Sequence, residues 1–214
     1  LLFGSFLIIA MEWHNTLAPL SVPGRLLAGF FQSVSARTAG FNTLSIGDMA
    51  NETLFVLILL MFIGASPGSC GGGVKTTTVA SIAILWASRL RGRERPQLFH
   101  RSISNESMGK AISVVMVSAI VVVIATMALL MTELGEISHT LSRGKFLELF
   151  FEVVSAFGTV GLSTGVTGSL SIAGKLIIIF VMFVGRLGPL VIALAVSRPR
   201  APRYYYAEET IMIG

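Results

Sequence analysis

The fold is decided by the stretch Phe150-Phe-Glu-Val-Val-Ser-Ala-Phe-Gly-Thr-Val-Gly-Leu-Ser-Thr164. An earlier stretch is similar to it and reads Phe30-Phe-Gln-Ser-Val-Ser-Ala-Arg-Thr-Ala-Gly-Phe-Asn-Thr43. Residues 38–40 correspond to residues 159–161 at an offset of 121, and Phe62-Ile-Gly64 corresponds to Phe183-Val-Gly185 at the same offset. Two correspondences at one offset indicate that the chain contains two copies of one unit.

Each copy predicts the same order of elements: an apolar helix, a short apolar stretch, a Thr-x-Gly turn and a second apolar helix. The short stretches, about residues 26–36 and 146–157, contain eleven or twelve residues. As helices they cover roughly half of a bilayer, so each can enter a membrane and return but cannot cross it. Both copies keep one orientation, which makes them parallel repeats about an axis along the membrane normal.

The composition is that of an integral membrane protein. Of the 214 residues, 53% are hydrophobic and 13% are charged, whereas soluble domains contain about 25% charged residues. This excludes an ordinary cytosolic enzyme, a disordered tail and a nucleic-acid-binding protein. The single cysteine, Cys70, excludes an internal disulfide framework.

Uncharged intervals predict two complete membrane helices. Residues 111–132 carry no charge and residues 176–197 carry only Arg186. Each interval is long enough to cross a hydrocarbon core of about 30 Å. Residues 1–11 are apolar but too few to cross it. We therefore expect the chain to begin inside a transmembrane helix and to be a fragment.

A third apolar interval contains a break. Residues 53–88 carry only Lys75, but a single helix of this length would extend about 54 Å, which is too long for a bilayer. Five glycines and a proline lie in the stretch 64–73, and they do not support an ordinary helix. The sequence predicts a half-helix, a loop buried inside the membrane and a second helix over residues 75–88.

Positive charge predicts the orientation. The loop 89–110 and the tail 198–214 are the most basic segments, so both are expected on the cytoplasmic side. The protein is then a multi-pass protein of the cell membrane with a cytoplasmic C-terminus. The loops that carry Glu12, Asp48 and Glu133 lie outside. Binding of nucleic acid by the basic loop is the alternative, but orientation explains the charge fully.

The two Thr-x-Gly turns predict a cation filter. A glycine at the end of a short helix can direct successive carbonyls one way, and carbonyl rings replace the hydration shell of K+ in channels whose loop reads T-V-G-Y-G. The negative ends of the short helices would also face a central cation. A glycine helix stop without a ligand is the alternative. The only metal site expected is a K+ site at this filter. The candidate filter residues are Thr38, Ala39, Gly40, Phe41, Asn42, Thr159, Val160, Gly161, Leu162 and Ser163.

Five stretches carry a resemblance to a known family. They are Arg37-Thr-Ala-Gly-Phe41, Gly68-Ser-Cys-Gly-Gly-Gly-Val-Lys75, Phe157-Gly-Thr-Val-Gly-Leu162, Gly185-Arg-Leu-Gly-Pro-Leu190 and Glu208-Glu-Thr-Ile-Met-Ile-Gly214. In these the chain resembles the C-terminal half of a membrane subunit of the Trk/Ktr/HKT superfamily of potassium transporters, of the Ktr type. The resemblance implies an all-α integral membrane fold with four tandem helix–pore loop–helix repeats around one pore, similar to potassium-channel pore units.

On this resemblance the chain holds two of the four repeats. Residues 1–88 are the third repeat, without most of its first helix, and include a pore helix, a filter at 38–43 and the broken helix. Residues 111–197 are the fourth repeat, with its filter at 159–164. Two quarters of a filter cannot surround an ion, so the missing N-terminal half of the same polypeptide is an expected partner.

The glycine-rich stretch 68–75 has two interpretations. It is similar to a Walker A loop, but Val74 puts the lysine out of register and no strand is predicted before it. The family resemblance implies instead an intramembrane loop that obstructs the pore as a gate below the filter. A passive break between two half-helices is a further alternative. The candidate gate residues are Gly64, Ser66, Gly68, Ser69, Gly71, Gly72, Gly73, Lys75 and Arg186.

Several charged side chains fall within the apolar segments. Arg186 is expected to face the bundle interior, because a central arginine exposed to lipid is costly; it either opposes a cation in the pore or pairs with carbonyls or Glu152. Glu148 and Glu152 are expected to hold the second short helix in place. Lys75 is expected to snorkel or to cap. Arg37 either braces the turn or lies at the outer mouth.

These features predict uptake of K+ across the cell membrane, with no enzymatic activity and no cofactor in this chain. Whether Na+ is an activator or a co-ion stays open. The family resemblance implies a homodimer, with residues 211–214 inserted at the contact, and a cytosolic nucleotide-binding ring docked on the loop 89–110 and the tail. The lipid bilayer is a further partner and nucleic acid is not.

Three other functions are alternatives to potassium uptake. A non-conducting remnant or assembly fragment is the first alternative, because two repeats are missing. A nucleotide-binding membrane enzyme subunit is the second. A secondary transporter with inverted repeats fits less well, because these repeats are parallel.

Overall fold

The structure is a computed structural model that describes residues 1–69, 71–92, 96–98, 101–135, 137–138 and 140–188. The described residues are mostly helical, as expected. The elements are α1 (Leu2–Glu12), α2 (Val22–Ser35), η1 (Ile46–Asp48), α3 (Asn51–Phe62), α4 (Thr76–Leu90), β1 (Gln97–Leu98), β2 (Arg101–Ser102), α5 (Asn105–Glu133), α6 (Lys145–Phe157), η2 (Val166–Ser169) and α7 (Ile172–Leu187). The short antiparallel pair β1–β2 lies in the segment that was expected to be a loop.

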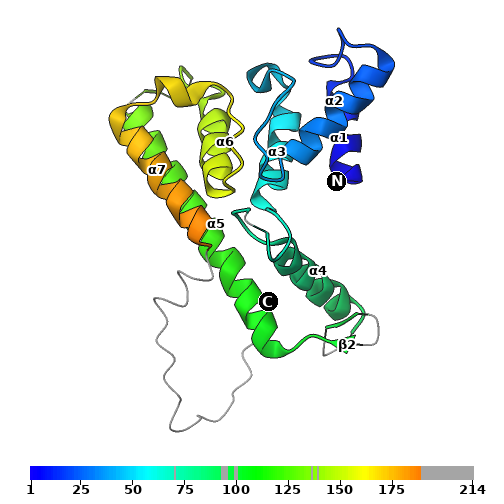
Figure 1. Ribbon diagram of the computed structural model, residues 1–214. Coiled ribbons are helices and arrows are strands. Elements are labelled where there is room, and N and C mark those ends of the chain that lie inside the picture. The colour runs from blue at the N-terminus through cyan, green and yellow to red at the C-terminus, as the bar shows by residue number, and fades with distance from the viewer. Residues whose placement is uncertain (70, 93–95, 99–100, 136, 139, 189–214) are drawn as a thin grey trace.

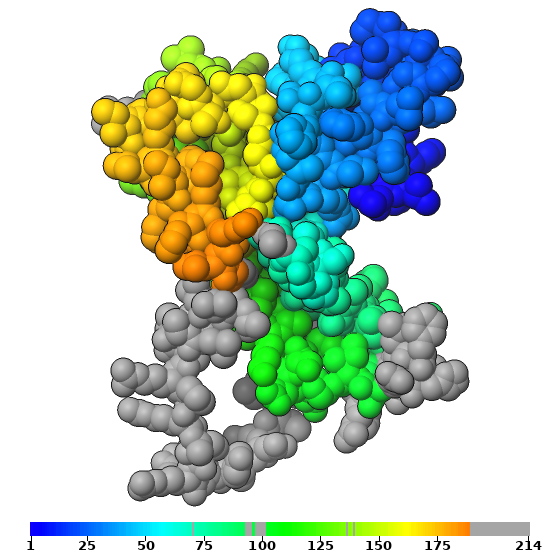
Figure 2. All heavy atoms as spheres, viewed as in Figure 1, coloured from blue at the N-terminus to red at the C-terminus, as the bar shows by residue number. Residues whose placement is uncertain are grey.

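The same order of elements occurs twice. A helix, a short helix, a 3-10 turn and another helix follow one another as α1, α2, η1 and α3, and again as α5, α6, η2 and α7. Within each group the helices pack on one another, and α3 packs on α6 to join the two groups (Figure 1). In the space-filling view the two groups meet along one seam (Figure 2). We call them the first unit and the second unit.

Helix α5 has the length of a membrane span. It runs for 29 residues, and among the described residues it alone is long and apolar enough to cross a bilayer. Helices α1 and α3 are shorter apolar helices. Helix α5 begins at Asn105, where Ser104 Oγ accepts a hydrogen bond from the amide of Ser107 at 3.2 Å. It therefore extends the predicted span 111–132 at its N-terminal end.

The helices that follow the two turns lie where the sequence predicts them, but their ends are shifted. The broken segment forms α3 and α4, and α4 occupies 76–90 where a helix over 75–88 was predicted. Helix α7 ends at Leu187, because Gly188 takes a left-handed φ of 82°. The rest of the span predicted to reach residue 197, and the tail 198–214, lie outside the described residues.

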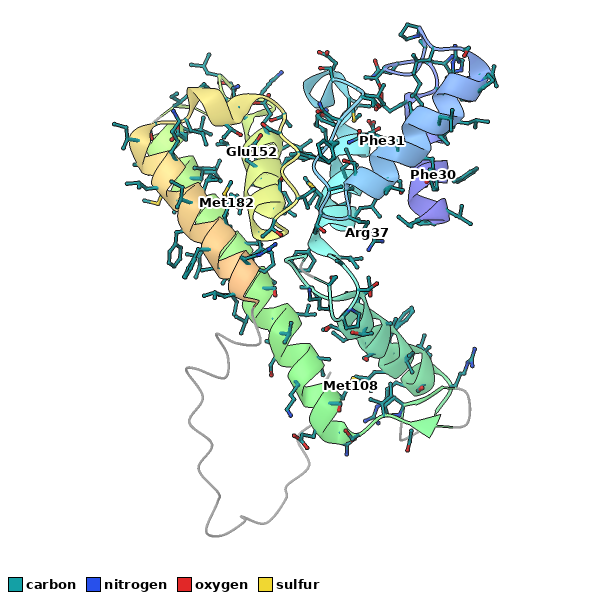
Figure 3. The ribbon with its side chains drawn as sticks, viewed as in Figure 1. Phe30, Phe31, Arg37, Met108, Glu152 and Met182 are labelled. Carbon is teal, nitrogen blue, oxygen red and sulfur yellow. The ribbon has the colours of Figure 1, made fainter. Side chains whose placement is uncertain are left out.

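The two short helices differ in how far they are buried. Helix α6 lies in the core, where the ring of Phe157 stacks on Phe62 with centroids 6.2 Å apart. Its buried residues include Leu149, Phe151, Glu152, Val153, Val154, Ser155, Ala156 and Phe157. Helix α2 instead exposes large apolar side chains, among them Phe30 and Phe31 (Figure 3). Helix α6 is therefore covered by α3, α5 and α7, whereas one face of α2 is open.

One carboxylate caps the last helix of each unit. The fully buried Glu12 at the end of α1 accepts hydrogen bonds from the amide of Ala50 at 2.9 Å and from Thr53 Oγ1 at 2.5 Å, both at the start of α3. Glu133 at the end of α5 accepts from the amide of Ser171 at 3.1 Å and from Ser171 Oγ at 2.6 Å, at the start of α7. A carboxylate at a helix N-terminus satisfies free amides and opposes the positive end of the helix dipole.

The capping residues of the two units are separated by the same number of residues as the two turns. Glu12 and Glu133 are 121 residues apart, and so are Ala50 and Ser171. Both glutamates are expected in outer loops from the sequence, and their capping role is not visible there, because their partners lie 38 residues away along the chain.

Replacing Glu12 with Gln is expected to destabilise the full-length protein by about 1–3 kcal/mol, because the amide cannot accept all five hydrogen bonds that the carboxylate receives. Glu133→Gln should cost less, since Glu133 bonds to Ser171 alone among the described residues. Thermal unfolding in detergent measures both effects. Glu106→Gln, which removes an exposed pair with Lys110, is the control and should not shift the melting temperature. Equal melting temperatures for E12Q and E106Q would contradict the capping role.

Candidate functional site

The two Thr-x-Gly turns share one unusual backbone conformation. Thr38 and Thr159 are the described non-glycine residues with positive φ, at 68° and 52°. The glycines two positions later, Gly40 and Gly161, have φ of 75° and 92°. A left-handed φ is rare and strained for a β-branched residue. Such strain persists only where the surroundings enforce it, and it is often found at functional sites.

A serine near the end of each short helix holds its turn on both sides. In the first unit the carbonyl of Ser35 accepts from the amide of Gly40 at 3.2 Å, and Ser35 Oγ donates to the carbonyl of Phe41. In the second unit the carbonyl of Ser155 accepts from the amide of Val160 at 2.9 Å, and Ser155 Oγ donates to the carbonyl of Leu162 at 2.6 Å. Sequence reasoning missed both serines, although each stands in the repeated Ser-Ala pair.

The two serine hydroxyls occupy backbone carbonyls of the predicted filter residues. The carbonyls of Phe41 and Leu162 are engaged by hydroxyl groups. The side chain of Asn42 donates to the carbonyl of Leu44 at 3.2 Å. Of the predicted filter residues, Phe41 and Leu162 thus have backbone carbonyls that bond to a serine hydroxyl.

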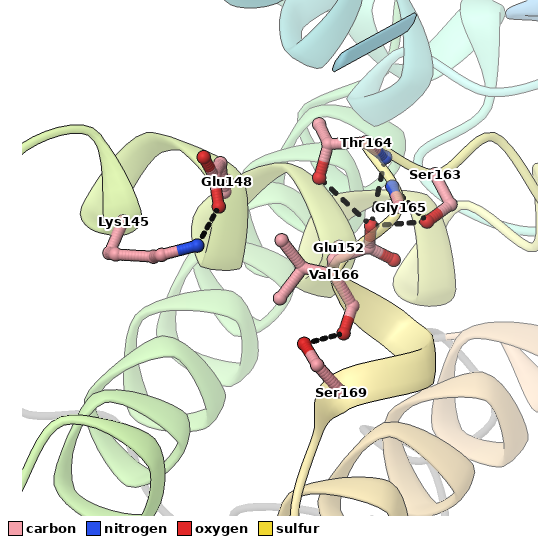
Figure 4. Close-up of polar contacts among 8 residues, drawn as sticks. All are labelled: Lys145, Glu148, Glu152, Ser163, Thr164, Gly165, Val166 and Ser169. Carbon is pink, nitrogen blue, oxygen red and sulfur yellow. Dashed lines mark hydrogen bonds and ion pairs between the residues drawn. The ribbon is translucent and has the colours of Figure 1, made fainter.

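Glu152 ties the second turn to its short helix (Figure 4). Its carboxylate accepts hydrogen bonds from Ser163 Oγ at 2.6 Å, from the amide of Thr164 at 3.0 Å and from Thr167 Oγ1 at 2.7 Å. It therefore holds the segment that follows the turn. Glu148, by contrast, forms an ion pair within α6, with Lys145 at 2.9 Å.

The corresponding residue of the first unit behaves differently. Gln32 stands where Glu152 stands in the second unit, at an offset of 120. Its side chain is 0% exposed, yet neither its amide nitrogen nor its amide oxygen has a partner among the described residues. The segment that follows the first turn thus lacks the anchor that the second one has.

The two turns touch each other. A methyl group on Gly40 would overlap the carbonyl oxygen of Val160, and one on Gly161 would lie 3.7 Å from the Cα of Gly40. Only a residue without a side chain fits at the first position. The structure therefore brings Gly40 of the first turn against Val160 and Gly161 of the second turn.

The glycine-rich loop, residues 64–75, is closed at its base. The amide of Gly64 donates to the carbonyl of Val74 at 2.8 Å, and the amide of Val74 donates to the carbonyl of Phe62 at 3.2 Å. Lys75 Nζ donates to the carbonyls of Gly71 at 2.5 Å and Ser69 at 3.3 Å. Lys75 therefore caps carbonyls of its own loop, which is one of its two expected roles.

Part of this loop lies against both turns. The amide of Gly72 donates to Thr159 Oγ1 at 2.9 Å. A methyl group on Gly71 would approach Thr38 Oγ1 to 2.7 Å. The tip does not contact the turns in this way, because a methyl group on Gly68 would meet nothing within 4 Å. Residue Ser66 also lies at the tip, where its carbonyl accepts from Ser69 Oγ at 2.6 Å.

Two cavities flank this region, and Arg186 lines both. The first has a volume of 630 Å³ and is also lined by Glu152, Thr159 and Met182. The second, of 320 Å³, lies between the loop glycines 71–73 and the end of α7. Arg186 therefore lies beside both the second turn and the loop. Among the described residues no group of three or more His, Cys, Asp or Glu side chains could hold a metal ion.

Comparison with known proteins decides the family. The model of the family described as "TrkH: Cation transport protein" matches residues 5–202. The chain belongs to the TrkH family of cation transport proteins. The resemblance stated from the sequence is thereby confirmed. Since this is a family of membrane transporters, the membrane location follows and the expectation that the chain is not an enzyme is confirmed.

Several relatives carry names of uptake systems. The chain is 39% identical to Ktr system potassium uptake protein D of Bacillus subtilis and 38% identical to Ktr system potassium uptake protein B of Vibrio alginolyticus, over 100% of this chain and 46% of each relative. It is 37% identical to the potassium/sodium uptake protein NtpJ of Enterococcus hirae, over 100% of this chain and 48% of that protein. The chain spans about half the length of the curated relatives it matches.

The fold is similar to a solved structure. The crystal structure of the potassium transporter TrkH from Vibrio parahaemolyticus matches with a TM-score of 0.72 at 19% identity, over 92% of this chain and 42% of that chain. This likeness supports the mostly helical membrane fold.

Replacing Gly185 in α7 with Ala is expected to destabilise the full-length protein by about 1–3 kcal/mol, because the added methyl group would overlap the backbone carbonyl of Phe157 at the end of α6. Thermal unfolding measures the loss. The matched control is Gly109→Ala in α5, where a methyl group meets nothing within 4 Å and alanine favours the helix. Equal stability of the two variants would show that Gly185 of α7 does not pack tightly against the end of α6.

Proposed function

We propose that the chain forms half of a K+-conducting pore and that residues 38–40 and 159–161 supply two walls of its carbonyl filter. The observation that carries the proposal is the contact between two Thr-x-Gly turns of identical left-handed pattern. Backbone carbonyls held at close quarters replace the water around a K+ ion. The names of the relatives, which are potassium uptake proteins, support this choice of ion.

The open surfaces of the chain support a ring of four units. Within the chain, the short helix α6 of the second unit packs on α3 of the first unit. Suppose that every pair of neighbouring units in the ring repeats this contact. The short helix α2 would then pack on the last helix of the unit before it, and α7 would pack on the short helix of the unit after it. Those are the faces that hold an apolar cavity of 490 Å³ at α2 and the cavity of 630 Å³ at α6 and α7. A missing half of similar length would fill both.

The glycine-rich loop is proposed as the gate. It is supported by the contacts of Gly71 and Gly72 with the two threonines that begin the turns. Arg186 beside the loop would add a fixed positive charge on the path of a cation, which raises the energy of an ion that rests there. Nucleotide binding by this loop is not favoured, because its backbone groups bond to one another, to Thr159 and to Lys75.

The remaining parts of the proposal concern topology and partners. We propose a multi-pass protein whose basic segment 89–110 and C-terminal tail face the cytoplasm and dock a nucleotide-binding ring, and which forms a homodimer. The role of Na+, as activator or as co-ion, stays open. The relative NtpJ is named a potassium/sodium uptake protein, which is a reason to measure the effect of Na+ on transport. A non-conducting assembly fragment is the alternative.

Serine at Gly40 or Gly161 is expected to lower the K+/Na+ selectivity of the full-length protein roughly tenfold or more, because a left-handed non-glycine residue costs about 1–3 kcal/mol. Gly40→Ser should have the larger effect, since its side chain also displaces the carbonyl of Val160. Ion flux into liposomes with K+ or Na+ measures the ratio. Gly168→Ser in η2, where nothing lies within 4 Å, is the control. Unaltered selectivity in both turn variants would remove the filter from the proposal.

Deletion of residues 211–214 tests the proposed role of the tail. We expect weaker dimers or a weaker response to the regulatory ring, because these apolar residues are proposed to insert at the dimer contact. Size-exclusion chromatography with light scattering, and flux with and without the ring, measure these two properties. A full-length protein that dimerises and responds as before would sink this part of the proposal.

A further inference from the structure

Arg37 connects the first turn to the start of the glycine-rich loop (Figure 3). It directly precedes Thr38, and its Nη1 donates hydrogen bonds to the carbonyls of Ile63 at 2.8 Å and Gly64 at 3.2 Å. We infer that Arg37 is a positioning residue that clamps the base of the loop to the filter, so that the loop leaves the pore only when this contact breaks. The inference rests on the proposed function of the loop as a gate.

The physical basis is the end of helix α3. The last carbonyls of a helix have no partner within it and carry the negative end of the helix dipole. Helix α3 ends at Phe62, and the guanidinium binds the two carbonyls that follow. A charged hydrogen bond at such a place is stronger than a neutral one. The Nε atom of Arg37 is buried without a partner among the described residues, so the side chain is held by its Nη1 contacts.

Breaking this contact would loosen the base of the loop. The amide of Gly64 is bonded to the carbonyl of Val74, so the carbonyl that Arg37 holds belongs to the residue that closes the loop. Farther along the loop, the amide of Gly72 donates a hydrogen bond to Thr159 Oγ1. One turn therefore holds the start of the loop, and the other turn holds its end.

The filter backbone has supports that do not involve the Arg37 side chain. Ser35 holds both sides of the first turn, and Ser155 holds the second. Removing the guanidinium should therefore release the loop while the shape of the filter persists. This separates a clamp from a residue that shapes the filter: the clamp changes how often the pore opens and leaves the choice of ion unchanged.

The test uses the full-length protein in liposomes, in a background where Cys70 is the only cysteine. Cys70 belongs to the loop sequence and lies outside the described residues, and it serves here as a chemical probe. For Arg37→Gln we expect K+ flux without the regulatory ring to rise roughly tenfold, as loss of a charged hydrogen bond implies. Reaction of Cys70 with a membrane-impermeant thiol reagent should accelerate to a similar degree, with the K+/Na+ ratio unchanged.

The control is another arginine that binds backbone carbonyls. Arg25 donates to the carbonyls of Trp13, Ala18 and Leu20, far from the loop. Arg25→Gln should leave flux and Cys70 reactivity as in the parent. Arg37→Lys keeps the charge but ends one atom sooner, so it should raise both readouts less than Arg37→Gln does. If R37Q fails to fold, the test rests on the Arg37→Lys variant. If Cys70 in that variant reacts at the same rate as in the parent protein, the clamp is overturned.

The outcomes separate the clamp from the proposed function. If R37Q conducts K+ and reacts at Cys70 as the parent does, the clamp is overturned and the pore stands. If R37Q loses selectivity, Arg37 shapes the filter and the clamp is again overturned. If the parent carries no K+ but Cys70 still reacts faster in R37Q, the proposed transport fails while the contact between filter and loop stands.

Discussion

The contact between the two Thr-x-Gly turns is the constraint on which the rest of the structure depends. At Gly40 the backbone of one turn meets the carbonyl of Val160 in the other, and no side chain fits between them. Two backbones can approach this closely only where glycine occurs. The approach in turn requires that each turn be held in a strained left-handed conformation by the structure behind it.

That structure consists of buried polar contacts made by the short helices. Ser35 and Ser155 hold the turns, and Glu152 holds the segment after the second turn. Each of these groups sits among apolar side chains, where an unmatched polar group is costly and a matched one fixes a single arrangement. The carboxylates of the buried Glu12 and of the more exposed Glu133 cap the last helix of each unit. The core thus combines an apolar packing with a small set of directional bonds.

Much of the fold was predictable because it is local. The mostly helical architecture follows from apolar length, and helix α5 covers the predicted uncharged interval 111–132. The family followed from motifs that are contiguous in the sequence, such as residues 157–162.

The contacts that build the candidate site were less predictable, because they join distant residues. The bond from Gly72 to Thr159 spans 87 residues, and that from Arg37 to Ile63 spans 26. Two alternatives for Arg37 stood open in the sequence, a brace or a position at the outer mouth, and its bonds to Ile63 and Gly64 match a brace. The anchoring serines were visible only as a repeated Ser-Ala pair, and residue type alone gave them no role.

The difference between Gln32 and Glu152 has a consequence for how the two units are held. Here the segment after the second turn is tied to its helix by hydrogen bonds to one carboxylate, whereas the amide at the same place in the first unit holds nothing among the described residues. Duplication has therefore left two units that are alike in backbone pattern but differ in the hydrogen bonds that hold the segment after each turn.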